Sequence, residues 1–194
     1  MMEDNYFEDR IFKKLSNGID SLEKGEYENC QFMDCDLSNL NLTGYVFSNC
    51  CFERCNLSLA QLAGTAIRDV YFKDCKMMGM RFDQCDTFGI SLKFLNCSLN
   101  HSSFYKLKLK KISFIECQLQ DVDFVETVLL SATFQGCDLG GAIFNKTNLE
   151  KADFRTSHNF SIDPEENSIR GAKFSQASLS GLLKKYKLII DPLQ

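Results

Sequence analysis

Phenylalanine or leucine recurs every five residues along most of this chain of 194 residues, with a small or thin apolar residue two positions before each. The repeated positions include Phe32, Leu37, Leu42, Phe47, Phe52 and, after one break, Phe94 onward to Phe154. A period of five fits neither the 3.6 residues of an α-helical turn nor the two-residue alternation of a strand. A fixed period held over ~150 residues indicates a repeat architecture in which each unit stacks on its neighbours.

Four five-residue units would close one turn of a square coil, which places residues twenty apart above one another. One such column is entirely phenylalanine if two residues are inserted between Phe82 and Phe94: Phe32, Phe52, Phe72, Phe94, Phe114, Phe134, Phe154 and Phe174. On the opposite side the repeat centres are leucine in the first coils and phenylalanine from Phe82 onward. The centres on the other two sides are mostly aliphatic. Rings and branched chains on alternate sides fill a narrow section at interior density. The sequence therefore predicts an all-β solenoid with a filled interior.

Several units share a small residue, then Asp or Asn, then Leu or Phe: Cys-Asp-Leu-Ser-Asn at 35–39, Cys-Asn-Leu-Ser-Leu at 55–59, Cys-Asp-Leu-Gly-Gly at 137–141 and Ala-Asp-Phe-Arg-Thr at 152–156. In these units the chain resembles the pentapeptide repeat proteins, which implies a right-handed quadrilateral parallel β-helix and no enzyme. We expect an N-terminal capping segment at 1–26 and the β-helix at 27–179. Residues 180–194 are expected to form a C-terminal cap or dimerisation segment made of a short helix and a strand.

Nine of the ten cysteines lie two residues before a repeat centre, and six of them form one column: Cys35, Cys55, Cys75, Cys97, Cys117 and Cys137. This position also takes Ala, Ser, Thr and Val, and an unpaired cysteine behaves as a small hydrophobe. We therefore expect reduced thiols packed in the core, in preference to a redox sensor or a metal string. A linear ladder lacks the four converging ligands of a zinc site. Cys51 alone falls on an outward position and is the candidate reactive thiol.

The repeat is irregular at two places. A two-residue bulge is expected near 83–93, around Thr87, Phe88 and Gly89, either as a tolerated loop or as a recognition feature. The coil at 156–170 has Asn159 and Pro164 where repeat centres should stand. We favour a tolerated loop for the bulge and a solvated turn for the coil.

Two groups of polar residues were considered as catalytic or metal sites. His158 lies close in sequence to Asp163, Glu165 and Glu166, but no second histidine accompanies it. His101 precedes Ser102, but one is outward and the other inward in this register, so their side chains should point apart. The sequence has no phosphate-binding loop or zinc-protease motif. We expect no enzyme, no cofactor and no metal.

The segment 180–194 carries an apolar series that is the candidate partner or dimer interface: Leu182, Leu183, Tyr186, Leu188 and Ile190. It could instead seal the last coil of its own chain, because a solenoid must cover the apolar section of its end. The resemblance favours a dimer somewhat, since the quinolone-resistance members of the family dimerise through their carboxy-terminal parts.

Those relatives protect DNA gyrase, a type II topoisomerase, and their acidic rods are thought to imitate DNA. A candidate acidic face in this chain comprises Asp83, Asp123, Glu126, Asp163, Glu165 and Glu166. However, residues 1–26 supply three of the four net negative charges, which leaves the rest nearly neutral. A polyanion mimic needs a sustained negative field. The short run Lys106, Lys108, Lys110 and Lys111 is also too small to predict direct nucleic-acid binding.

The leading hypothesis is a non-enzymatic scaffold that binds an unidentified protein partner. A DNA-mimicking gyrase modulator is the alternative, and an enzyme is a distant third. Residues 1–26 lack the basic flank and apolar run of a secretory signal, and no stretch is long enough to span a membrane. We therefore expect a cytoplasmic protein that does not bind membranes.

Overall fold

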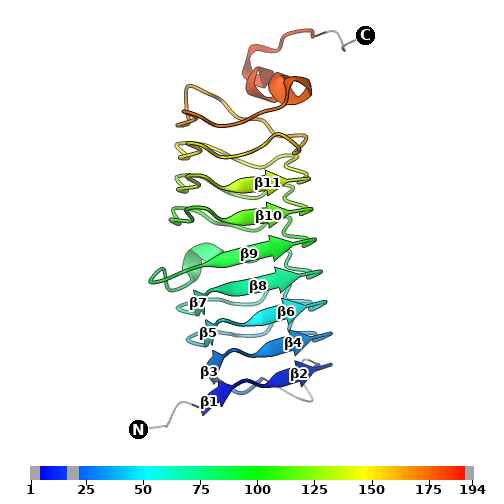
Figure 1. Ribbon diagram of the computed structural model, residues 1–194, viewed down its shortest axis with the longest axis vertical. Helices are drawn as coiled ribbons and strands as arrows, with labels where there is room; N and C mark the ends of the chain where they lie inside the picture. The colour runs from blue at the N-terminus through cyan, green and yellow to red at the C-terminus, as the bar shows by residue number, and fades with distance from the viewer. Residues whose placement is uncertain (1–4, 17–21, 191–194) are drawn as a thin grey trace.

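The computed structural model describes residues 5–16 and 22–190, which form a rod of stacked coils with the two ends of the chain at opposite ends of the rod (Figure 1). All strand pairing is parallel in this part of the chain, and successive coils are linked residue by residue at a spacing of twenty. The all-β parallel β-helix expected from the sequence is confirmed.

Two sides of the rod carry parallel sheets. The first sheet has the order β1 (Asn5–Glu8), β3 (Gly25–Glu28), β5 (Val46–Ser48) and β7 (Ala66–Arg68). The second has the order β11 (Thr133–Gln135), β10 (Ser113–Ile115), β9 (Leu92–Leu95), β8 (Val70–Lys73), β6 (Cys51–Glu53), β4 (Gln31–Met33) and β2 (Ile11–Lys13). Elsewhere the coils are joined by single parallel bridges such as Asn41 to Gln61 and Ser98 to Gln118.

The corners explain why the repeat is five residues long. The residue two positions after a repeat centre has a positive φ, for example 55° at Asp34, 57° at Asn39 and 54° at Asn49. This left-handed conformation turns the chain sharply, and Asp, Asn and Gly adopt it at least strain. Each side is therefore a short extended segment that ends at a corner, and four corners close a coil.

The predicted phenylalanine column forms a continuous stack through the rod. Adjacent rings lie nearly parallel with centroids 5.2 Å apart from Phe94 to Phe114 and again from Phe114 to Phe134. Rings of the opposite side, such as Phe104 and Phe124, meet this stack edge to face at 5.7 and 6.0 Å. These five side chains have no more than 1% of their surface exposed. The core is thus one column of interlocked rings and aliphatic chains.

Within the segment expected as a cap, residues 5–8 and 11–13 continue both sheets by one strand each. Strand β1 pairs with β3 and strand β2 pairs with β4, each at a spacing of twenty residues. Phe12 stacks on Phe32 with centroids 5.0 Å apart, so the phenylalanine column begins earlier than the sequence reading placed it. Gly25 permits this pairing because a Cβ there would overlap the main-chain oxygen of Asn5.

The two-residue insertion is present. Strand β8 pairs with β9 at a spacing of 22 residues, with Val70 opposite Leu92, whereas Asp86 still bridges Ala66 at a spacing of twenty. The two extra residues therefore lie between Asp86 and Leu92, where the chain departs from the regular side of the coil. The 3₁₀ helix η1 (Phe82–Gln84) occupies the preceding side of the same coil.

Candidate protein-interaction surface

The interior offers no room for a substrate. Its cavity, lined by side chains that include Phe52, Leu57 and Phe82, has a volume of about 10 Å³. Small-molecule sites have ~300 to 1,000 Å³. Any recognition must therefore use the walls, the bulge or the ends of the rod.

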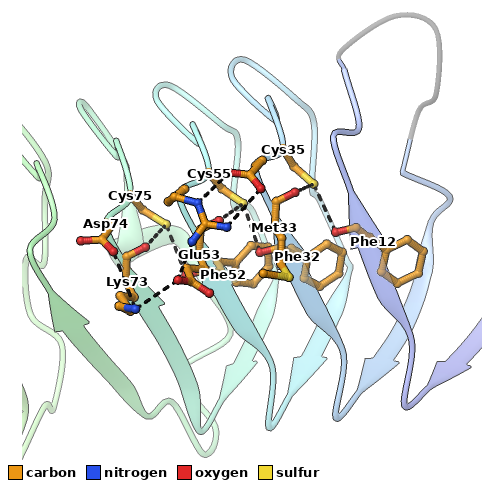
Figure 2. Close-up of polar contacts among 12 residues, drawn as sticks. Phe12, Phe32, Met33, Cys35, Phe52, Glu53, Cys55, Lys73, Asp74 and Cys75 are labelled. Carbon is orange, nitrogen blue, oxygen red and sulfur yellow. Dashed lines mark hydrogen bonds and ion pairs between the residues drawn. The ribbon is translucent and has the colours of Figure 1, made fainter.

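The cysteine column lies in the core, as predicted. Figure 2 shows the thiols of Cys35, Cys55 and Cys75 beside the phenylalanine stack, each close to main-chain oxygens of its own coil and of the preceding one. Cys55 Sγ lies 3.3 Å from the oxygen of Phe32, one coil away. These contacts satisfy the weak S–H donor without a second thiol, so the column serves as packing.

Burial disfavours the thiolate form of two core cysteines that lie outside the column. It raises the pKa of Cys50 to about 12 and that of Cys85 to about 12. Cys51 is partly exposed, in agreement with its expected outward position, but partial burial and the charge of Glu53 raise its pKa as well. A thiol with a raised pKa forms little thiolate at neutral pH and is a poor nucleophile.

The histidines do not form catalytic pairs. Ser102 is buried and its hydroxyl donates to the oxygen of Met77 at 2.9 Å, whereas His101 is exposed and lies 3.6 Å from Asp121. His158 Nε2 lies 4.0 Å from Asp138, and Asp163 instead contacts Lys185. Among residues 5–16 and 22–190 no group of three or more His, Cys, Asp or Glu side chains is arranged to hold a metal ion.

The carboxy-terminal segment folds back onto the last coil of its own chain. Two 3₁₀ helices, η2 (Gln176–Leu182) and η3 (Lys184–Tyr186), lie across the end of the rod (Figure 1). The amide of Ile162 donates to the oxygen of Gly181 at 3.0 Å. Gly181 packs so closely on Phe160 that a Cβ would lie 2.5 Å from the ring. The expected helix is thus 3₁₀ in character, and the expected strand is not formed at residues 188–190.

The five candidate interface residues divide into two groups. Leu182 packs against the core and helps to seal the last coil. Leu183, Tyr186, Leu188 and Ile190 retain 36%, 52%, 58% and 51% of their surface exposed, and Ile189 beside them is 98% exposed. The segment therefore seals its own coil with one side and presents an apolar surface with the other.

The candidate acidic residues do not form a continuous negative strip. Arg81 donates to both oxygens of Asp83 at 2.9 and 2.7 Å. Burial is the largest single influence on Asp83 and opposes its ionisation, but the hydrogen bonds and charge of Arg81, together with a hydrogen bond from Ser103, hold the pKa of that carboxyl below its usual range. Glu126 lies 3.6 Å from Lys106. Asp123 is bridged to Ile143 on the next coil, and its carboxylate accepts a hydrogen bond from the amide of Val125.

The structure brings Asp163 and Glu165 together through a lysine that the sequence analysis had not linked to them. Lys185 Nζ lies 2.8 Å from Asp163 and 2.5 Å from Glu165, and the hydroxyl of Tyr186 donates to Glu165 at 3.0 Å. Lys185 lowers the pKa of both carboxyls. We call this cluster the latch. Glu166 is exposed beside it.

A groove of about 480 Å³ lies between the last coil and helix η2. Its lining includes Arg155, His158 and Lys184. Arg155 is already held by Asp153 at 2.7 Å, and Lys184 donates to the main-chain oxygen of Asn159 at 3.1 Å. Lys184 therefore fastens the cap to the rod, whereas Arg155 is engaged by a carboxylate of its own coil.

A four-sided parallel β-solenoid with a filled interior belongs to the class of repeat proteins that are built from stacked β coils. The model of the pentapeptide repeat region matches residues 26–95 and 90–185, and the chain belongs to the pentapeptide repeat family. No curated protein sequence matches it.

Solved structures with the same fold include two trypsin-treated forms of QnrB1, a plasmid-mediated fluoroquinolone resistance protein. The first is 16% identical, with a TM-score of 0.63 over 97% of this chain and 98% of that one. The second is 19% identical, with a TM-score of 0.53 over 98% and 100%. HetL, a pentapeptide repeat protein involved in heterocyst differentiation regulation from the cyanobacterium Nostoc sp. strain PCC 7120, is 13% identical, with a TM-score of 0.50 over 92% and 86%. At these identities the likeness concerns the fold.

None of the α-helices or 3₁₀ segments within residues 5–16 and 22–190 is long and apolar enough to cross a membrane.

Proposed function

We propose that this protein is a non-enzymatic, cytoplasmic scaffold that binds a protein partner through the outer surface and the carboxy-terminal end of its rod. The observation that carries this proposal is the apolar surface of Leu183, Tyr186, Leu188 and Ile190, which remains exposed after Gly181 and Leu182 have sealed the last coil. Apolar surface left over at the end of a filled solenoid is typical of an interaction site. No cofactor, membrane or nucleic acid takes part in this function.

The simplest occupant of the end surface is a second copy of the chain. A two-fold contact would bring the same residues together from both copies, as closed dimers do. Light scattering of the purified chain at several concentrations tests this. We expect a dimer that becomes a monomer in the double variant Leu188→Asp, Ile190→Asp. The matched control is Leu59→Asp, which places the same charge on an exposed wall residue at 59% exposure. If the wild-type chain is a monomer at all concentrations, the end surface does not bind a second copy and would have to bind another protein.

The second candidate function is modulation of DNA gyrase by imitation of DNA. It is supported by the likeness in fold to QnrB1, a fluoroquinolone resistance protein, and by the acidic residues Asp123, Glu126 and Glu166 on the wall. Ion pairs at Asp83, at Glu126 and in the latch weaken the field of this face, and we therefore rank this function second. A gyrase supercoiling assay with and without a quinolone is the test. Absence of any effect at micromolar concentrations would eliminate this candidate.

A further inference from the structure

The two-residue insertion produces an ordered projection on one side of the rod. Residues 87–89 are exposed, whereas Ile90 packs back against the core. In Figure 1 this loop extends beyond the neighbouring coils just before β9. Phe88 at its tip is 78% exposed, far more than the buried phenylalanines of the repeat.

Contacts with the wall fix the position of this phenylalanine. Its amide donates to Asp86 at 3.0 Å, and its oxygen accepts from Arg68 Nε at 3.5 Å. The guanidinium of Arg68 also lies over the ring, 5.9 Å from its centroid, and 3.7 Å from Asp86. Gly89 has a φ of 71°, which closes the turn. The ring is therefore held outward by the fold, so its binding would require little additional ordering.

Three lysines, Lys108, Lys110 and Lys111, lie on the same side of the rod as the bulge, one coil further along. Asp86 bridges Ala66, and Lys108 bridges Val128, so both belong to one column of the solenoid. The bridge between Arg81 and Ser103 has an offset of 22 residues, which places Lys108 and the residues after it on the coil that follows the bulge. Lys108, Lys110 and Lys111 are exposed, and no carboxylate of the described residues forms an ion pair with them.

We propose that the surface formed by Arg68, Phe88, Lys108, Lys110 and Lys111, which we call the bulge surface, binds an acidic segment of a protein partner, with Phe88 inserted among apolar side chains of that segment. This proposal rests on the proposed scaffold function and adds a site and a partner chemistry to it. Coils are ~4.8 Å apart, so the ring and the lysines are close enough to contact one short segment together.

Charge complementarity identifies the occupant. Lys108, Lys110 and Lys111 are three cations within four residues, and no ion pair among the described residues engages them. An acidic segment would be attracted to this local positive charge, whereas the rest of the wall is nearly neutral. An aromatic side chain held in its bound position is typical of the residues that dominate binding energy, since little entropy is lost on association.

A polynucleotide fits the same surface less well. Three lysines occupy a single coil, and Asp69, Asp86 and Glu150 interrupt the positive charge on the adjoining coils. Nucleic-acid tracks need a continuous series of cations with aromatic platforms for successive bases. Here one aromatic ring is present, so an acidic protein segment is the better match.

Binding of two synthetic peptides to the full chain tests the proposal by fluorescence anisotropy. Both peptides have a Leu-Trp-Leu centre, flanked by four glutamates on each side in one peptide and by four glutamines in the other. We expect saturable binding of the glutamate peptide below about 1 mM, and at least about tenfold weaker binding of the glutamine peptide. We expect the variants Phe88→Ala and Lys110→Glu each to weaken the first interaction by about fivefold or more.

Matched controls are Leu59→Ala, another exposed apolar residue, and Lys173→Glu, the same charge change on a different side of the rod; both should leave binding unchanged. Lack of saturable binding, or equal binding by Phe88→Ala and Lys110→Glu, would overturn the proposal. Tighter binding of poly(U) RNA through the same residues would overturn it in favour of a nucleic-acid site. A dimer that depends on Leu188 and Ile190 would persist whichever result the peptides give. Failure of the proposal for the bulge surface is therefore distinguishable from failure of the proposed scaffold function.

Discussion

Truncation of one ring in the middle of the phenylalanine stack should destabilise the rod much more than the same change at its first coil. Phe114 is fully buried and stacks on Phe94 and Phe134, each with centroids 5.2 Å away. It also meets Phe104 and Phe124 edge to face. Phe12 is only partly buried and stacks on one phenylalanine of its column, Phe32.

The magnitude follows from these contacts. Replacing a buried phenylalanine by alanine costs about 3 to 5 kcal/mol of unfolding free energy, through lost burial and the cavity that remains. The loss of two stacked and two edge-to-face ring pairs places Phe114→Ala at the upper end of this range, since a ring pair contributes about 0.5 to 1.5 kcal/mol beyond burial. Phe12→Ala removes a partly buried ring from the end of the stack and should cost about 1 to 2 kcal/mol.

Urea unfolding followed by far-UV circular dichroism measures both effects, with Phe114→Leu as a control that keeps most of the volume. We expect the order Phe114→Ala, then Phe114→Leu, then wild type in rising stability, with Phe12→Ala near the leucine variant. Equal costs for Phe114→Ala and Phe12→Ala would refute the argument that each coil is stabilised by neighbours on both sides. A cost below about 1 kcal/mol for Phe114→Ala would mean that the core is not close-packed.

Three further predictions concern the cap and the thiols. Gly181→Ala should loosen the cap, because the added Cβ would overlap the ring beneath it; faster hydrogen exchange at residues 176–186 is the measurement, and unchanged exchange would contradict the packing. The latch should weaken at acid pH, because Lys185 lowers the folded-state pKa of Asp163. The ion pair between them therefore stabilises the folded chain fully above the unfolded pKa of ~3.9. This stabilisation is lost as the pH falls through the lower folded-state pKa. Protection of residues 176–186, taken relative to the exchange rate of the unstructured chain at each pH between 7 and 3, tests this, and in Lys185→Met that protection should no longer change with the titration of Asp163. In native protein a maleimide should label Cys51 slowly and Cys50 only after unfolding; rapid labelling of Cys50 would show that this part of the core is accessible.

The repeat made the regular part of the fold predictable. Because each residue of the period has a fixed direction, the spacing of Phe94 and Phe114 sufficed to place both in one column, and the cysteines two positions before each centre could be assigned to the core. The insertion near 83–93 was also visible, since it displaces every later phenylalanine by two residues.

Sequence reasoning was weakest where the period fails. The pairing of residues 5–8 and 11–13 with the first regular coil was not predicted, because the repeat centres Phe7 and Phe12 are followed by an interrupted pattern; a capping role for 1–26 stays a prediction. The strand expected near Leu188 and Ile190 is not formed in the described residues, since an apolar run by itself does not distinguish a strand from an irregular segment.

What the sequence by itself determined is therefore the period, the columns and the filled interior, because these depend on contacts between residues at one constant spacing. Only the tertiary structure decided that Lys185 reaches Asp163 and Glu165, and that Arg68 lies over the ring of Phe88. These contacts join residues at the cap and the bulge, where the spacing changes. The geometry of the closed coil, rather than any local pattern, determines which side chains meet there.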